Sequence, residues 1–319
     1  MVFESYKLKI QCGIGETHMG CRIKTQVKLD YIQDFEMMFE RMKLHRPREA
    51  AVYYTILIID SPKEFSEFLS IAKDLANLTR RPLETGRNCL LSNGLIAKVL
   101  FAHEPKHHFG RESYLPVHPE AVWEFIKEDI RNVVAPETYH VIEQRMNKYS
   151  EYYKDNYDKY GIKLKRNGNV TIEYNGKWTM YNILHNSMDH GNDVKLQISG
   201  KRFFTEPFID YFKKYLELDK NIKVIVDSDI PLDLVKEFNE EYGNKLELRY
   251  FPDGSSGTLR NFVYGKEFAV NGIKILQNQE TEPTYVGTAY VDIDDIKIFN
   301  SKFDSLWSIA KPLTKEKNN

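Results

Sequence analysis

RRPLETGRNCLLSNGLIAKVLF, residues 80–101, passes from a helical pattern into a strand pattern. The first part predicts a helix that begins after Pro82. Asn93-Gly94 is typical of a helix end, and the alternating apolar and polar residues of Ile96–Phe101 predict a strand. The elements predicted before this helix and after this strand decide the fold of the N-terminal half.

Two further helices are predicted before this stretch and one strand after it. Pro47 is suited to opening the first helix, and Ser61-Pro62-Lys63-Glu64 predicts the start of a second that runs to about Asn77. A polar turn, His103–Gly110, and a returning strand, Glu112–Val117, follow. Three helices and a two-stranded hairpin are typical of a winged helix-turn-helix, in which the third helix enters the major groove and the hairpin contacts phosphate.

Positive charge is concentrated on this third helix and hairpin, because residues 80–111 hold six basic residues and two acidic ones. Small polar residues on the same helix are suited to base edges or phosphate. The predicted contacts to double-stranded DNA are Arg80, Arg81, Thr85, Arg87, Asn88, Ser92, Lys98, Lys106, His107, His108 and Arg111. The alternative is an ordinary solvated charged face.

The whole chain, by contrast, is nearly neutral. Its 319 residues include 45 Lys and Arg and 46 Asp and Glu, a net charge of −1. This excludes a histone-like polycation. Residues 41–115 alone hold 12 basic and 8 acidic residues, so a basic segment is combined with a mildly acidic remainder.

Cysteine usage and hydropathy exclude other classes of protein. The three cysteines form no disulfide framework. Cys12 and Cys21, with His18 between them, do not have the paired ligands of structural zinc, so we expect free thiols, no metal and no cofactor. No apolar run is long enough to span a bilayer, and the start lacks the apolar core of a signal peptide, so we expect a cytoplasmic protein without membrane contact.

Four regions are expected along the chain, giving a multidomain α+β and α/β fold. Residues 1–44 form an N-terminal extension, predicted as a β-hairpin of Tyr6–Cys12 and Cys21–Ile32 followed by a helix, Gln33–Lys43. Residues 45–118 form the winged helix-turn-helix and residues 119–161 a helical linker broken at Pro136. Residues 162–319 form an α/β domain.

The helical linker carries a seven-residue repeat of apolar and aromatic residues. This repeat predicts a coiled coil that joins two copies of the chain into a homodimer. The predicted contacts between the copies are Tyr139, Ile142, Met146, Tyr149, Tyr153 and Tyr160. The alternative is an amphipathic helix that packs on its own domain.

Strands and helices alternate through residues 162–319. Strands are predicted at Val170–Tyr174, Val194–Ser199, Ile222–Asp227, Leu246–Phe251, Phe262–Val270, Ile273–Gln277 and Tyr285–Val291. The helices between them have roughly 10–15 residues, which indicates a largely parallel sheet. Asn271-Gly272 predicts a hairpin between two of these strands.

Two pieces of the N-terminal half resemble archaeal TrmB-type transcription regulators. Glu49-Ala50-Ala51-Val52-Tyr53 is similar to the E-A-x-V-Y of their first helix, and Gly110–Glu120, GRESYLPVHPE, is similar to the G-R-x-x-Y-x-x-V-x-P-E that follows their wing. The resemblance implies a DNA-binding regulator in which a coiled coil and a phospholipase-D-like α/β sandwich follow the winged helix. Some members of that family bind sugars in this sandwich.

Phospholipase D enzymes carry His-x-Lys-x4-Asp, in which the histidine attacks phosphorus and the lysine holds phosphate oxygens. The corresponding stretch here is Tyr264–Gly272, YGKEFAVNG, so Tyr264 replaces the histidine and Asn271 the aspartate. No His-x-Lys occurs in the chain, and a phenol with a pKa of about 10 is a poor nucleophile at neutral pH. We therefore expect a non-catalytic domain. The alternative is an ordinary hairpin with a surface lysine.

A ligand could still bind the α/β domain at the carboxyl ends of its strands. The candidate contacts to a small-molecule effector are Ser199, Asp227, Tyr264 and Lys266. For Asp227, capping of the next helix is an alternative role. The sequence thus predicts a dimeric transcription regulator, with a phospholipase-D-class phosphodiesterase or nuclease and a sequence-nonspecific architectural DNA-binding protein as alternatives.

Overall fold

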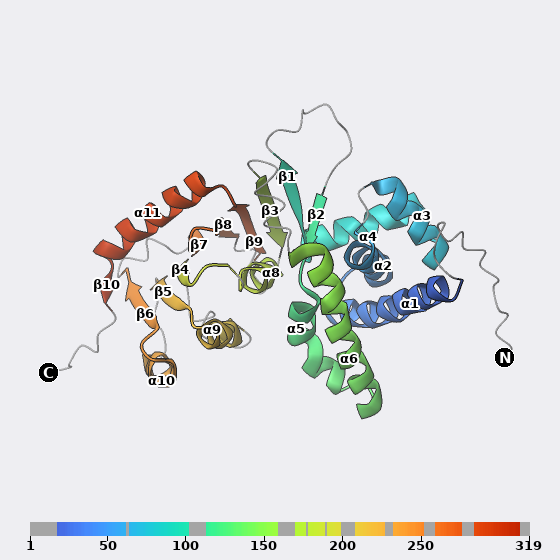
Figure 1. Ribbon diagram of the computed structural model, residues 1–319, viewed down its shortest axis with the longest axis horizontal. Coiled ribbons are helices and arrows are strands. Elements are labelled where there is room, and N and C mark those ends of the chain that lie inside the picture. The colour runs from blue at the N-terminus through green and yellow to red at the C-terminus, as the bar shows by residue number, and fades with distance from the viewer. Residues whose placement is uncertain are drawn as a thin grey trace. The chain divides into compact units, whose positions relative to one another are not determined.

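The computed structural model describes residues 18–61, 64–101, 113–158, 170–176, 178–188, 190–198, 208–226, 232–251, 259–275 and 284–312. These residues form two compact units, each described here by itself. The first holds residues up to Ser92 together with Val122–Asp158, and the second holds the remainder of the described chain. Helices dominate the first unit and a ten-stranded sheet the second (Figure 1).

The first unit is built around one buried helix. Its helices are α1 (His18–Arg41), α2 (Pro47–Ile59), α3 (Phe65–Ala76), α4 (Arg80–Asn93), α5 (Pro119–Arg131, which starts in the second unit), α6 (Pro136–Tyr153) and the π-helical turn η1 (Lys154–Asp158). The expected start of α2 at Pro47, the end of α4 at Asn93 and the break at Pro136 are confirmed, whereas α4 begins at Arg80, before the expected start after Pro82. α3 starts at Phe65, later than the Ser61-Pro62 signal predicts, because Ser61 adopts a left-handed φ of 44°.

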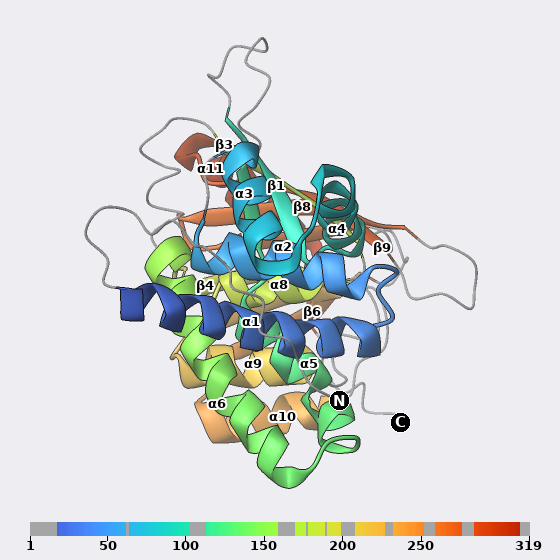
Figure 2. The same ribbon diagram turned by 90° about the vertical axis from the view of Figure 1, so that its right-hand side faces the viewer.

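Helix α2 is apolar on all sides, and neighbouring helices cover it. Every residue of Ala50–Ile58 is buried. The ring of Phe35 on α1 lies 4.8 Å from that of Tyr54, and Figure 2 shows α1 running along α2. On another side, Phe68 of α3 stacks on Tyr53 at 4.5 Å. Aromatic pairs at these distances add to the free energy gained from burial alone.

The end of α2 is held by residues about a hundred positions later in the chain. Tyr157 donates a hydrogen bond of 2.7 Å from its hydroxyl to the carbonyl of Leu57. The side-chain amide of Asn156 donates to the carbonyl of Ile58, also at 2.7 Å. The last carbonyls of a helix have no partner within the helix, so η1 satisfies groups that burial would otherwise leave unpaired.

The N-terminal extension is helical where its alternating apolar and polar residues predicted a strand. Cys21–Ile32 forms part of α1, so the predicted strand is wrong there, while the helix expected at Gln33–Lys43 is its continuation. The physical reason is the spacing of Tyr31, Phe35 and Phe39, which brings all three to one face of a helix and buries them. The other predicted strand, Tyr6–Cys12, lies outside the described residues.

Helix α6 packs into the core of its own chain, which favours the alternative of an amphipathic helix over the expected coiled-coil seam. Its inward residues are fully or almost fully buried: Ile142, Met146, Tyr149 and Tyr153. The ring of Tyr149 lies 4.0 Å from Tyr31 and 4.9 Å from Phe35, so a second copy could not reach it without opening this core. Tyr139 packs on Trp123 of α5, and Tyr160 lies outside the described residues.

Helix α4 approaches α2 closely at a glycine. A Cβ built on Gly86 would lie 2.3 Å from the carbonyl oxygen of Glu49 and 2.9 Å from the amide nitrogen of Ala50. Leu83 and Leu90 are buried on the same side of α4. A residue with any side chain at position 86 would push the two helices apart.

We expect Gly86→Ala to lower the free energy of unfolding by about 1–3 kcal/mol, because the backbones must separate. This loss outweighs the gain in helix propensity of roughly 1 kcal/mol that alanine brings over glycine. Urea denaturation would measure it, with the exposed Asn88→Ala on the same helix as control. A Gly86→Ala variant as stable as the wild type would contradict the close approach.

A partly buried ion pair joins α1 to α6. Asp34 is 4% exposed, and its carboxylate accepts a hydrogen bond of 2.8 Å from Arg145 Nη2, while Arg145 Nε lies 2.7 Å from the other oxygen. Asp30 lies 3.9 Å from the same guanidinium. Burial raises the pKa of Asp34 from 3.8 to about 6, and Arg145 opposes part of that rise.

This pKa predicts a pH dependence of stability. A raised carboxyl pKa favours the protonated form in the folded state, so the stability contributed by Asp34 is full below about pH 4 and is lost as the pH rises to about 6. We expect Asp34→Asn to flatten this part of the curve of unfolding free energy against pH, by roughly 2 kcal/mol. Urea titrations between pH 4 and pH 7 would test it. An unchanged slope would assign the titration to other groups.

The second unit is organised by its sheet. Its strands are β1 (Ile96–Phe101), β2 (Ser113–Pro116), β3 (Val170–Gly176), β4 (Asp193–Gln197), β5 (Asn221–Val226), β6 (Leu246–Tyr250), β7 (Leu259–Tyr264), β8 (Phe268–Ile275), β9 (Thr284–Tyr290) and β10 (Lys311–Pro312). Their order across the sheet is β10-β6-β5-β4-β7-β8-β9-β3-β1-β2. The hairpin expected after α4 is present as β1 and β2, and β1 also pairs with β3.

Only three strands of this sheet are parallel. β4, β5 and β6 run in one direction, and every other pairing is antiparallel, so the expected largely parallel sheet is wrong. Helix α9 (Phe208–Glu217) connects β4 to β5 and α10 (Leu232–Tyr242) connects β5 to β6, whereas β7 and β8 form an antiparallel hairpin.

The hairpin turn lies at a different glycine from the predicted one. Gly265, with a φ of 56°, makes the turn between β7 and β8, whereas Asn271-Gly272 lies inside β8. Gly272 is needed there for another reason: a Cβ on it would lie 3.0 Å from the carbonyl oxygen of Val286 and 3.3 Å from the Cα of Gly287. The glycine signal therefore marks a close approach of two strands instead of a turn.

Helices cover both faces of the parallel part of the sheet (Figure 1). α9 (Phe208–Glu217) and α10 (Leu232–Tyr242) lie on one face, and α11 (Ile293–Ile309) lies on the other. α8 (Thr179–Asn186) follows β3. Within the described residues, no helix has the length and apolar character required to cross a membrane.

Candidate nucleic-acid interface

The predicted DNA-contacting residues of α4 lie on the side away from its buried face. Leu83, Gly86 and Leu90 are buried. Arg81, Thr85, Asn88 and Ser92 follow one another at intervals of three or four residues and form one outward stripe, and Arg80 and Arg87 lie on the adjacent stripe. The structure therefore brings these six residues together on one side of the helix.

Hydrogen bonds already engage most of the small polar groups on this surface. Thr85 donates from its hydroxyl to the carbonyl of Arg81 at 2.9 Å, and Ser92 donates to the carbonyl of Cys89 at 3.1 Å. Phosphate oxygens accept hydrogen bonds but donate none, so these hydroxyls would have to leave the helix backbone to bind them. The guanidinium groups are therefore the main donors of this surface.

An aromatic residue of α3 contacts two of these guanidinium groups. The Cζ atoms of Arg80 and Arg87 lie 5.6 Å and 5.9 Å from the centre of the Phe65 ring. Phe65 is only half-buried. Its position at the start of α3, close in space to α4, could not be read from helix periodicity.

The remaining five predicted contacts lie in the second unit or outside the described residues. Lys98 lies in β1 of the second unit, with Tyr114 of β2 on one side and Glu173 of β3 on the other. The other four, Lys106, His107, His108 and Arg111, lie outside the described residues.

The residue in the histidine position of the phosphodiesterase motif is buried and part of a hydroxyl network. Tyr264 is fully buried at the end of β7, and its hydroxyl lies 3.1 Å from that of Tyr215 on α9. Tyr215 in turn donates to the carbonyl of Leu184 at 2.6 Å. Burial raises the pKa of Tyr264 well above its usual value, so the phenol stays protonated at neutral pH.

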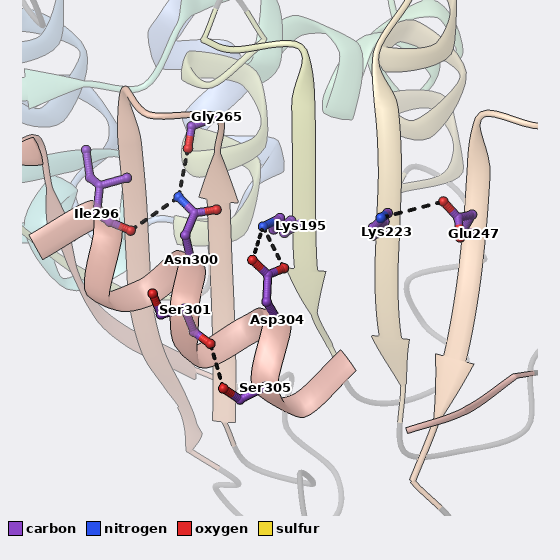
Figure 3. Close-up of polar contacts among 9 residues, drawn as sticks. All are labelled: Lys195, Lys223, Glu247, Gly265, Ile296, Asn300, Ser301, Asp304 and Ser305. Atoms are coloured by element: carbon purple, nitrogen blue, oxygen red, sulfur yellow. Dashed lines mark hydrogen bonds and ion pairs between the residues drawn. The ribbon is translucent and has the colours of Figure 1, made fainter. Parts of the chain in front are cut away.

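The turn that follows Tyr264 is fixed by α11. Asn300 donates from its side-chain amide to the carbonyl of Gly265 at 2.9 Å and to that of Ile296 at 3.2 Å (Figure 3). In the same view, Asp304 of α11 accepts two hydrogen bonds from Lys195 of β4. Lys266 itself is exposed in this turn.

The motif positions point to different sides of the sheet. Val263 and Ala269 pack together against Ile296 of α11, so Asn271, two residues beyond Ala269 on β8, shares the α11 side. Tyr264, next to Val263, faces the opposite side, where Tyr215 lies. Tyr264 and Asn271 therefore cannot act on one phosphate.

Of the predicted ligand contacts, Ser199 and Asp227 lie outside the described residues. Tyr264 and Lys266 are two residues apart, one buried and one exposed. The described part of the chain thus places no two of the four residues around a common ligand position.

One group of described residues has metal-ligating side chains: the ligand atoms of His118, Glu120 and His185 lie within 4.8 Å of one another. His118 Nδ1 accepts a hydrogen bond of 3.1 Å from the backbone amide of Glu120, at the start of α5. Lys214 Nζ lies 3.5 Å from the carboxylate of Glu120. A metal ion would compete with both this ammonium and the positive end of the helix, so we interpret the group as a helix cap.

Comparisons with known proteins give only distant similarities. No protein-family model matches the sequence, and no curated protein matches it. Among solved structures, TrmBL2, an archaeal chromatin protein with a novel mode of DNA binding, is similar over 88% of this chain and 99% of its own, with 16% identity and a TM-score of 0.35. Nuc from Salmonella typhimurium, a phospholipase D family member, is similar over 41% of this chain and 88% of its own, with 11% identity and a TM-score of 0.31.

Polyphosphate kinase from Porphyromonas gingivalis is similar over 93% of this chain and 71% of its own, with 9% identity and a TM-score of 0.34. With TM-scores of 0.31 to 0.35, these similarities assign neither a family nor a function to this chain.

We expect Tyr264→Phe to destabilise the protein by about 1 kcal/mol, because it removes a buried hydroxyl from the network with Tyr215. Lys266→Ala, in the exposed turn, should change the free energy of unfolding by less than about 0.5 kcal/mol. Urea denaturation would compare the two. Turnover of a generic phosphodiester by the wild type that is lost in Lys266→Ala would contradict the structural role and indicate catalysis.

Proposed function

We propose that this chain is a DNA-binding protein that contacts duplex DNA through the outward side of α4. The observation that carries the proposal is the two-sided character of this helix. Its inner side is held against α2 at Gly86, and its outer side presents Arg80, Arg81 and Arg87. A rigidly held helix with several guanidinium groups is suited to binding phosphate and base edges.

The order of elements supports a more specific form of this proposal. Three helices, α2 to α4, are followed by the hairpin β1–β2, which is the order of a winged helix-turn-helix. Together with the resemblance to TrmB-type regulators in the stretches 49–53 and 110–120, this order favours a transcription regulator in which α4 is the recognition helix. In this proposal the part of the second unit that follows the hairpin is a non-catalytic sensor or interaction domain.

A sequence-nonspecific architectural DNA-binding protein is the second candidate. It is favoured by one observation: the hydroxyls of Thr85 and Ser92 are hydrogen-bonded to their own helix, which leaves mainly guanidinium groups as donors. Contacts to phosphate position a protein on DNA without reading its sequence. A phosphodiesterase is disfavoured by the buried, protonated Tyr264 and by its separation from Asn271.

We expect Arg81→Ala and Arg87→Ala each to weaken binding to duplex DNA roughly tenfold and to flatten its salt dependence. Each lost phosphate contact should lower the slope of log K against log salt by about 0.9. Fluorescence anisotropy with a labelled duplex of about 25 base pairs between 50 and 200 mM KCl would measure both quantities.

The matched control is Lys236→Ala, which removes an exposed cation from α10 in the second unit and should leave affinity unchanged. If both arginine variants bind DNA with the same affinity as the wild type, the DNA-binding surface does not include this side of α4. Competition with random duplex then separates the two candidates, because a specific regulator prefers its own site by about 10³-fold or more, and an architectural protein does not.

A further inference from the structure

Phe65 connects two arginines that are seven residues apart on α4. Both guanidinium groups lie within cation–π distance of the same ring, at 5.6 Å for Arg80 and 5.9 Å for Arg87. The two positions are separated by about two turns, or about 10 Å along the helix axis. A single ring on the neighbouring helix α3 therefore restrains both side chains.

A second contact orients each guanidinium through its Nε atom. Arg80 Nε lies 2.9 Å from Glu84 Oε1, and Arg87 Nε lies 3.4 Å from Asn88 Oδ1. The side chain of Arg80 is still 73% exposed, so its terminal nitrogens face solvent although its Nε is engaged. This is the edge that forms two parallel hydrogen bonds with a phosphate group.

Restraint of this kind matters because a long, exposed arginine loses rotamer freedom when it binds. Immobilising such a side chain at an interface opposes binding, and holding it in its bound geometry beforehand reduces that cost. Each cation–π contact at an exposed site is weak, yet Phe65 acts on two arginines at once. Arg81 lies on the other stripe of α4, so substitutions there can be compared with substitutions of the two arginines that contact Phe65.

We propose that Phe65 is a positioning residue that restrains Arg80 and Arg87 for contact with backbone phosphates of one duplex. This inference rests on the proposed DNA binding and adds a residue that itself contacts no DNA. It also distinguishes a positioned pair, Arg80 and Arg87, from Arg81, which works independently of the ring.

The experiment combines substitutions at Phe65 with those at the arginines. Phe65→Leu keeps an apolar side chain but removes the π face, and Phe65→Tyr retains that face. We expect Phe65→Leu to weaken duplex binding about fivefold, Phe65→Tyr to stay within about twofold of wild type, and Ser70→Ala, an exposed change on α3, to have no effect. Urea midpoints measured in parallel report any loss of fold.

Double-mutant cycles separate positioning from general loss of structure. In an Arg80→Ala/Arg87→Ala background, Phe65→Leu should cause no further loss of affinity, whereas in an Arg81→Ala background its fivefold effect should remain. The inference is overturned if Phe65→Leu binds like wild type, or if its effect is the same in both backgrounds. A wild type that does not bind duplex DNA at all overturns the proposed function and this inference together.

Discussion

Burial of α2 on every side is the constraint on which the first unit depends. A helix that is apolar around its whole circumference must be enclosed by other elements. Here α1, α3, α4, α6 and η1 each supply part of that enclosure, through Phe35, Phe68, Gly86, Tyr149 and Tyr157. The N-terminal extension and the helix α6 are therefore parts of the same core as the three central helices, and not appendages to it.

The same enclosure explains how α4 can present charge outward. Its inner side is closed at Gly86, where the backbone of α2 is in direct contact, and none of its charged residues is among the buried residues of the helix. Three arginines on such a helix repel one another, and the contacts with Glu84, Asn88 and the ring of Phe65 offset part of that cost. The contact with α2 therefore decides which side of α4 is buried and which residues remain available on its surface.

Local patterns in the sequence predicted most elements, and long-range pairing accounts for most of the errors. The periodicity of Ala50–Ile58 and the strand patterns of residues 194–226 were sufficient for α2, β4 and β5. Local patterns could not predict the direction of the strands, because direction depends on which other strand each one pairs with. Asn271-Gly272 was assigned to a turn because a glycine needed for close strand contact has the same local signature as one needed for a turn. Phe65 was missed as a neighbour of arginines because its partners lie on another helix.

The contact between Tyr157 and Leu57 has a consequence for synthesis of the chain on the ribosome. A hundred residues separate the two partners, so α2 emerges from the ribosome well before α6 and η1 exist to cover it. At typical translation rates of about 5–20 residues per second, this interval lasts roughly 5–20 seconds. During that time the apolar Tyr, Ile and Val side chains of α2 are exposed, so chaperones can bind them and nascent chains can associate through them. The first unit therefore completes its core late, after the strands β1 and β2 have already been made.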